Sequence, residues 1–221
     1  MSKLRTLWQS TVGKKAVMAV TGIVMILYLL VHAAGNLLIF GGPDSINGYA
    51  AFLHRTVPLL WFVRVVLLAS IGLHILAGYQ LTRRAWAARP VAYQKRVPQA
   101  STWASRSMRT GGVAIALFVT FHILHLTTGT IRPVEYSEGQ VYDAVVGGFG
   151  IWWVAALYVV AMAFVGLHVF HGTWASFRTV GVARPSPNPL FRSVATIVAG
   201  ALWIGFTLIP LAIIAGAISL R

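Results

Sequence analysis

Histidines are the residues of this chain best suited to chemistry, because six of the seven lie inside long apolar runs. An imidazole is costly in hydrocarbon unless it has a partner, so ionisable residues at membrane depth are candidates for function. Imidazole is also a common metal ligand. The six form two pairs three residues apart and two single residues, namely His122 and His125, His168 and His171, His32, and His74.

Composition limits the ligands that the chain can offer. Of 221 residues, 57% are hydrophobic and 10% charged, with a mean hydropathy of +0.75, which is typical of a polytopic membrane protein and excludes a sizeable soluble domain. Cysteine is absent, which excludes disulfides, thiolate-bound iron–sulfur clusters, cysteine-bound zinc and covalent haem attachment within this chain. Histidine is therefore the metal ligand that remains in the membrane.

The apolar runs predict one all-α membrane domain over residues 1–221, because about 20 apolar residues cross the hydrocarbon core. Four helices are expected to form a histidine-bearing bundle beside a fifth helix in which Pro210 introduces a kink. A loop with turn chemistry is expected over Gly41–Gly48. The five spans are predicted at about residues 16–40, 58–81, 110–131, 150–177 and 194–220.

The formal charge of +14 follows from 18 Lys and Arg against four acids, and the basic residues are unevenly distributed. The amino-terminal segment, the second loop and the fourth loop carry 4, 7 and 3 basic residues and no acid. In a soluble protein such a balance suggests nucleic acid, but here the positive-inside rule accounts for it. The rule predicts a cytoplasmic amino terminus and, after five spans, a carboxyl terminus outside.

Two histidines are predicted in the outer half of the membrane. His32 lies 17 residues after Lys15 and His122 lies 13 after Arg109, which are depths of about 25 Å and about 20 Å from the cytoplasmic end at 1.5 Å per residue. Their helices run in the same direction. They are expected to share one haem as axial ligands.

Two others are predicted in the inner half. His74 lies nine residues before Arg83 and His168 lies ten before Arg178, or about 14 Å and about 15 Å from the cytoplasmic end. These two are expected to hold a second haem. For a single intramembrane histidine the alternative is an interhelical hydrogen bond, which does not explain four residues matched in depth.

The second member of each close pair has several candidate roles. His125 and His171 lie about 60° round the helix from their neighbours. Either could replace a ligand, or bond a haem propionate, a quinone or a helix neighbour. Arg83 and Arg178 are further candidates for a propionate contact.

Four stretches around these positions carry further information: GGPDSINGYAAFLHRTVP, GLHILAGYQL, TGGVAIALFVTFHILH and GLHVFHGTWASF. Together with a histidine late in the first span, they resemble the cytochrome b membrane anchor of succinate:quinone oxidoreductases, in the form with one five-helix subunit and two haems b. The resemblance covers most of the chain. In that family one histidine from each of helices one to four ligates haem iron, and the matching positions are His32 and His122 for the outer haem and His74 and His168 for the inner.

The resemblance implies an electron conduit in a bacterial cytoplasmic membrane, as the quinone-reducing subunit of succinate dehydrogenase, or respiratory complex II, of the tricarboxylic acid cycle. A flavoprotein subunit would oxidise succinate, and an iron–sulfur subunit would dock on the basic cytoplasmic face. Electrons would then cross through both haems to a quinone, usually menaquinone in this subgroup. The chain itself would perform no succinate chemistry and bind no nucleic acid.

The resemblance also suggests a quinone site near the outer haem. Its candidates are His54, Asn36, Asn47 and Tyr49, for which a helix cap at Asn36 and an exposed loop at His54 are equally good explanations. A site near the inner haem is the alternative, with Arg83, Trp174 or His171.

One position departs from the pattern. Some relatives carry a glutamate two residues before the helix-four ligand, linked to proton movement, and this chain has Gly166. A carboxylate proton route through that helix is therefore not expected.

Two other interpretations remain open on the sequence. One is the dihaem b subunit of another respiratory enzyme, of the formate dehydrogenase or hydrogenase type. The other is a haem-free transporter or scaffold with histidines in a proton path, which would give a colourless protein.

Overall fold

The protein is all-α, and the computed structural model describes residues 3–88, 102–131, 134–135, 139–182 and 189–220. Within these residues there are five helices long and apolar enough to cross a membrane, as predicted: Thr11–Gly41, Val57–Ala87, Trp103–Thr127, Trp152–Thr179 and Pro189–Ile214. The described part contains no strand. Several basic loop residues and prolines of the prediction lie outside the described residues: Arg89, Pro90, Lys95, Arg96, Pro98, Arg132 and the ARPSPN segment from Ala183 to Asn188.

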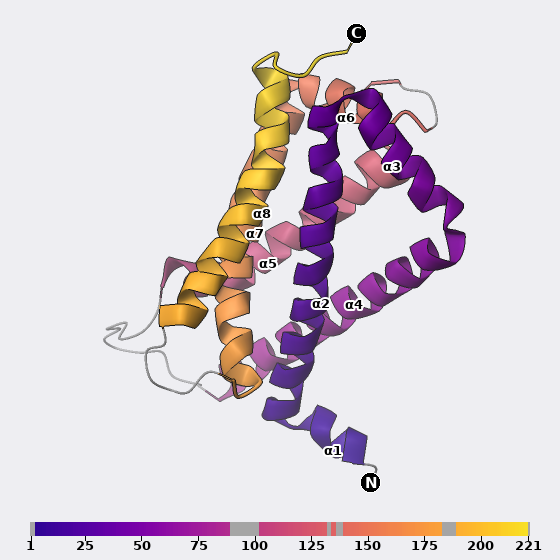
Figure 1. The fold of residues 1–221 in the computed structure, drawn as a ribbon. Coiled ribbons are helices and arrows are strands. Elements are labelled where there is room, and N and C mark those ends of the chain that lie inside the picture. The colour runs from indigo at the N-terminus through magenta and orange to yellow at the C-terminus, as the bar shows by residue number, and fades with distance from the viewer. Residues whose placement is uncertain (1–2, 89–101, 132–133, 136–138, 183–188, 221) are drawn as a thin grey trace.

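The first three long helices run up, down and up through the bundle (Figure 1). The short α1 (Lys3–Gln9) lies at what we call the lower end and leads into α2 (Thr11–Leu37), which ends in the 3-10 turn η1 (Leu38–Gly41). Helix α4 (Val57–Ala87) returns to the lower end, and α5 (Trp103–His122) rises again and closes with the π-helical turn η2 (Ile123–Thr127).

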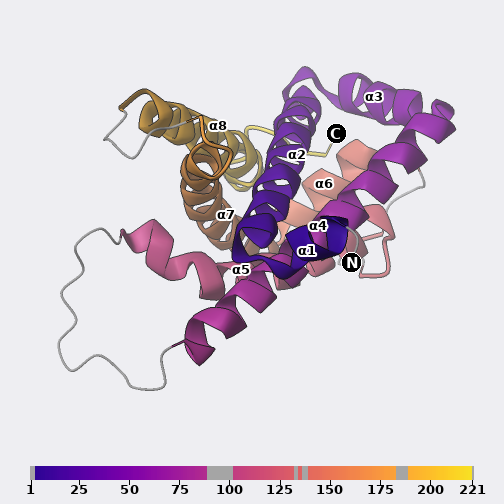
Figure 2. The same cartoon turned by 90° about the horizontal axis from the view of Figure 1, so that it is seen from below.

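Two further long helices complete the bundle, and short helices cover its upper end. Helix α7 (Trp152–Thr179) descends and α8 (Pro189–Ile214) ascends beside it, as both views show (Figures 1 and 2). The connection before α4 is α3 (Pro43–Arg55), and the connection before α7 is α6 (Val141–Gly150). Both short helices lie at the upper end.

Two of the predicted loops contain helices instead. The GGPDSING segment begins α3, because Gly42 adopts φ 89° and ψ −179°, a conformation open essentially to glycine, and Pro43 then occupies the first helical turn. Helix α6 forms where a loop was expected before the fourth span, and it buries Tyr142, Val145 and Phe149 in the upper core. The turn residues were correctly placed, but they start helices.

Most span boundaries differ from the prediction because local caps set them. Helix α2 starts at Thr11 with the Ser10 hydroxyl accepting from the Gly13 amide, and α5 starts at Trp103 through a reciprocal capping box between Thr102 and Ser105. The fifth span stops at Ile214, six residues early. The amides of Gly216 (φ 74°) and Ala217 bond back to Ile213 and Ala212, which is a Schellman motif. Pro210 is buried within α8.

The five long helices pack against one another unevenly. Helix α7 packs against α8, α5 and α2, and α8 also packs on α2. Helix α4 packs along α2 and touches α3, and much of its apolar surface is exposed, including Leu68 at 64% and Val65 at 60%. The order around the bundle is therefore α4, α2, α7 and α5, with α8 in the groove of α2 and α7.

The lower end of α4 is held by polar contacts that sequence reasoning did not anticipate. The Lys14 amine, 3% exposed, donates to the Trp8 carbonyl and to Gln80 Oε1 on α4. One turn further, Arg84 donates to the Gln9 carbonyl at 2.7 Å. These bonds fix α1 and the start of α2 to the α4 segment that follows His74.

Candidate functional site

The upper pair of histidines meets across one diagonal of the bundle. His32 on α2 and His122 at the end of α5 have ring centroids 5.9 Å apart and ring planes at 86°. In the described residues α2 and α5 make no extensive backbone contact, so these two helices meet here through the side chains. Tyr28 stacks on His32 from the preceding turn at 5.3 Å, and Phe206 of α8 closes the other side at 5.7 Å.

The lower pair meets across the other diagonal. His74 on α4 and His168 on α7 have ring centroids 6.1 Å apart, with ring planes at 54°. Among the described residues α4 and α7 likewise lack extensive backbone contact. The structure thus brings together the same two pairs that depth in the membrane suggested.

Both separations suit a single metal ion between two imidazoles. A metal held at about 2.0 Å from one nitrogen of each ring places the ring centroids about 6 Å apart. The described residues contain no group of three or more His, Cys, Asp or Glu positioned to hold a metal ion. Each pair therefore offers two ligands only, which is too few for a structural zinc ion and is the number that a haem iron takes at its axial positions.

One histidine of each pair has its Nδ1 atom held by a hydroxyl group. His74 Nδ1 lies 3.2 Å from Thr21 Oγ1, and His122 Nδ1 lies 3.2 Å from the Tyr158 hydroxyl. A ring bonded at Nδ1 presents Nε2 to a metal, and such partners fix ring orientation and raise the basicity of a ligand. The donor set therefore fits axial ligation.

Each of these hydroxyl groups belongs to a helix whose own histidine is in the other pair. Thr21 lies on α2, three helical turns before His32, and it serves the lower pair. Tyr158 lies on α7, ten residues before His168, and it serves the upper pair. At 1.5 Å per residue these intervals separate the two levels by about 15 Å. Each of α2 and α7 thus contributes to both sites.

Two glycines lie beside the lower rings, at positions where an added Cβ would make an ordinary van der Waals contact with the ring. A Cβ on Gly22 of α2 would lie 3.5 Å from His74 Cε1, and a Cβ on Gly112 of α5 would lie 3.8 Å from His168 Cε1. His168 Nδ1 is buried and has no hydrogen-bond partner among the described residues. A buried polar atom without a partner is uncommon and suits a ring whose binding partner is an added group.

His125 has a helix neighbour as its partner, one of the roles left open above. Its side chain is 1% exposed, its Nδ1 lies 3.0 Å from the Tyr158 hydroxyl, and its ring packs on Gly148 of α6. His171 is half-buried on α7, one turn below His168.

The two candidate propionate arginines lie at the lower end. Arg178 is exposed and stacks 5.9 Å over the Trp174 ring, and Arg83 is exposed near the end of α4. The neighbouring Arg84 was not singled out, although it makes the bond to the Gln9 carbonyl.

The four quinone candidates lie at the upper end, and three of them already have hydrogen bonds. Asn36 donates to the His32 carbonyl at 2.7 Å, and His54, which is exposed, pairs with the Ala50 carbonyl of its own helix. Asn47 joins α3 to α6 by donating to Gln140 Oε1 and accepting from the Tyr142 amide. Tyr49 packs its ring against Gly35.

Gly166, where some relatives carry a glutamate, faces α8. A Cβ at this position would lie 3.4 Å from Trp203 Cβ. A longer side chain there would therefore meet a packed helix interface, and the chain has no carboxylate at this point of α7.

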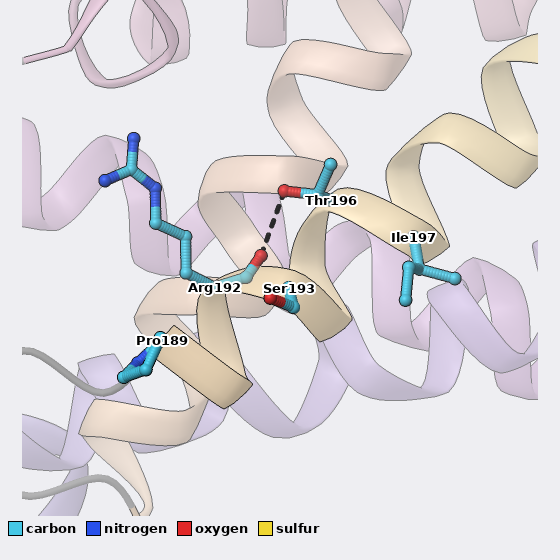
Figure 3. A pocket seen from close by; sticks show the side chains of 5 residues that line it. All are labelled: Pro189, Arg192, Ser193, Thr196 and Ile197. Atoms are coloured by element: carbon cyan, nitrogen blue, oxygen red, sulfur yellow. Dashed lines mark hydrogen bonds between the residues drawn. The ribbon is translucent and has the colours of Figure 1, made fainter.

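A shallow hollow of about 490 Å³ at the lower end of α8 is not part of these sites (Figure 3). Its five lining residues are exposed, and none of the histidines lines it. The Thr196 hydroxyl there donates to the Arg192 carbonyl of its own helix. These residues are Pro189, Arg192, Ser193, Thr196 and Ile197.

Thr21 and Tyr158 are the site residues that sequence reasoning missed. Thr21 is 11 residues before His32, about 20° round the helix from it, so this hydroxyl shares a helix face with a histidine. Tyr158 is 10 residues before His168, about 80° round the helix, so periodicity was an available signal for Thr21 alone. Which ring each hydroxyl contacts depends on how the helices pack.

The chain has no match among known protein families, curated proteins or solved structures.

Proposed function

We propose that this chain is the cytochrome b membrane anchor of a succinate:quinone oxidoreductase, which passes electrons from an iron–sulfur subunit through two b haems to a quinone. The observation that carries the proposal is the pair of crossed imidazole contacts, His32 with His122 and His74 with His168, one above the other in the bundle. A bound haem would carry one electron at a time.

The chain's own residues would bind and orient these groups. Each of the four histidines would hold haem iron through a ring nitrogen, and in His74 and His122 this nitrogen would be Nε2, because Thr21 and Tyr158 hold those two rings at Nδ1. The apolar helices around the rings would keep water away from both sites, which influences the potential of a bound haem.

The distribution of charge supports an orientation with the lower end in the cytoplasm. Most of the described basic residues lie there, whereas Asp44 and Asp143 lie on the upper helices α3 and α6, together with one basic residue, Arg55. By the positive-inside rule the amino terminus would be cytoplasmic in a bacterial inner membrane. The iron–sulfur subunit, with the flavoprotein behind it, would dock on this end. The basic residues at this end include Arg5, Lys14, Lys15, Arg83, Arg84, Arg106, Arg109, Arg178 and Arg192.

The quinone, which we propose to be menaquinone, would bind at the upper end near His32. Tyr49 is the candidate without a hydrogen bond among the described residues, and it contacts α2 at Gly35, three residues from His32. His54 is exposed on the same helix. A phenol or an imidazole can donate to a quinone carbonyl.

Purification of the chain from its native membrane with its partners tests this function. We expect a flavoprotein and an iron–sulfur protein to copurify, and added succinate to reduce b-type haem in the preparation. Copurification with a formate dehydrogenase or hydrogenase subunit would instead show that the electrons come from formate or hydrogen and not from succinate. A colourless protein without haem would overturn the proposal and favour a transporter.

A further inference from the structure

The Tyr158 hydroxyl lies between two histidines of the same helical segment. It is 3.2 Å from His122 Nδ1 at the end of α5 and 3.0 Å from His125 Nδ1 in the π-helical turn η2. Tyr158 is 6% exposed, and Phe118 and Phe149 meet its ring edge to face at 4.9 Å and 4.7 Å. The phenol therefore has a fixed place in the upper core.

A phenol has one proton to donate, so the two contacts cannot both be donations from Tyr158. In one order, Tyr158 donates to His122 Nδ1, and the proton of the neutral His122 ring is then on Nε2. In the other order, His122 Nδ1–H donates to the phenol oxygen, and Tyr158 donates onward to His125 Nδ1. Of these two orders, only the second leaves His122 Nε2 with a lone pair for a metal. A third arrangement, in which both rings donate Nδ1–H to the phenol oxygen, does so too, but it gives the phenol proton no acceptor in this group.

We propose that Tyr158 is a positioning residue for the upper haem ligand and that His125 sets the direction of its hydroxyl proton. This inference rests on the proposed function. His125 accepts at Nδ1 and carries its own proton on Nε2, so the phenol oxygen is free to accept from His122. This order of hydrogen bonds would leave His122 Nε2 free to hold the iron of the upper haem.

The lower pair has no described residue in the role that His125 plays for the upper pair. The Thr21 hydroxyl donates to the Val17 carbonyl of its own helix at 2.7 Å, which leaves its oxygen to accept from His74. The direction of that bond is set by backbone alone. The upper pair depends instead on a side chain, His125, so substitutions can change one haem without the other.

Tyr158→Phe tests the proposal, because it keeps the ring and removes the hydroxyl. We expect the upper haem, identified as the one lost in His32→Ala, to bind about 10–100-fold more weakly. Its midpoint potential should rise, because a less basic imidazole stabilises oxidised iron less. Each tenfold change in the ratio of oxidised to reduced affinity is about 59 mV for one electron. The lower haem should keep its potential.

Two matched variants serve as controls. Tyr142→Phe also removes a hydroxyl from a buried tyrosine, 6% exposed, whose partner is the Ser219 carbonyl at 3.1 Å. It should leave both potentials unchanged. Thr21→Val should shift the lower haem only.

Changes at His125 test the direction of the proton. His125→Phe should weaken the upper haem as Tyr158→Phe does, and His125→Asn, which keeps an acceptor near the Nδ1 position, should restore part of the loss. In the reduced, diamagnetic protein, nitrogen NMR of labelled histidine should show the His125 proton on Nε2. A proton on His125 Nδ1 would overturn the proposal whatever the variants do.

The outcomes separate the two proposals. A wild-type protein that binds two haems, with an upper potential unaltered in Tyr158→Phe, would overturn this inference and leave the proposed function intact. A wild-type protein that binds no haem would overturn both.

Discussion

Gly148→Ala tests the packing that holds His125 in place. A Cβ at position 148 would lie 2.8 Å from His125 Nε2 and 2.9 Å from its Cε1, closer than side-chain carbons approach in folded proteins. The ring cannot withdraw freely, because it is 1% exposed, stacks on Phe121 at 5.4 Å and is bonded to Tyr158. Overpacking of this kind costs about 1–3 kcal/mol.

The better helix propensity of alanine offsets part of that cost, by up to about 1 kcal/mol. We therefore expect Gly148→Ala to lower the free energy of unfolding by up to about 2 kcal/mol. The matched control is Gly200→Ala in α8, where the added Cβ would meet no atom of the described residues within 4 Å apart from the neighbouring backbone of its own helix. That variant should be stabilised by up to about 1 kcal/mol.

Reversible unfolding in mixed detergent micelles, followed by the helical circular dichroism signal, measures both variants. The two substitutions have the same chemistry and opposite expected signs. Equal stabilisation of the two would refute the packing of His125 between Gly148 and Tyr158.

Three further predictions concern the helix ends. Gly42→Ala should lower the unfolding free energy by about 1–3 kcal/mol, since only glycine readily adopts φ 89° with ψ −179°. An unchanged unfolding free energy would mean that α3 can begin with a different backbone conformation at position 42. Ser10→Ala should cost about 1 kcal/mol and speed amide exchange at Gly13, because the cap is lost, and unchanged exchange there would contradict this cap. Lys14→Met should speed exchange in α1, since bonds to the Trp8 carbonyl and to Gln80 are lost, whereas slower or equal exchange would show that these bonds do not hold α1.

The five spans and the two histidine levels could be predicted because helix geometry converts distance along the chain into depth. The interval from Lys15 to His32 fixes the height of that ring whatever its neighbours are. Pairing His32 with His122 then required only the assumption that histidines at equal depth lie side by side.

Lateral arrangement could not be predicted in the same way. Depth does not say that α4 lies on α2 and that the histidine pairs cross the diagonals. It also does not say that Tyr158 of α7 reaches His122 of α5, since that contact depends on the rotation of both helices. The misread segments have a local cause, because Gly42 followed by Pro43 is a turn signal and a helix-start signal at once.

The exposed face of α4 has a consequence for how the protein responds to a ligand. Helix α4 is tied to the bundle through α2 and α3, and its His74 reaches His168 without extensive contact between the two backbones among the described residues. A group bound between these rings would join α4 to α7. We therefore expect haem binding to slow amide exchange in α4 more than in α8, whose contacts with α7 and α2 are already made.

Haem content per chain, in the wild type and in two alanine variants, tests the central claim most directly. A redox-difference spectrum of the purified protein with haem quantified should give two b-type haems per chain. His74→Ala and His32→Ala should each leave one, and the spectrum of the haem that remains should differ between them, because one variant keeps the upper pair and the other the lower pair. A wild-type chain without haem, or two haems retained in both variants, would contradict the assignment of these histidines as axial ligands.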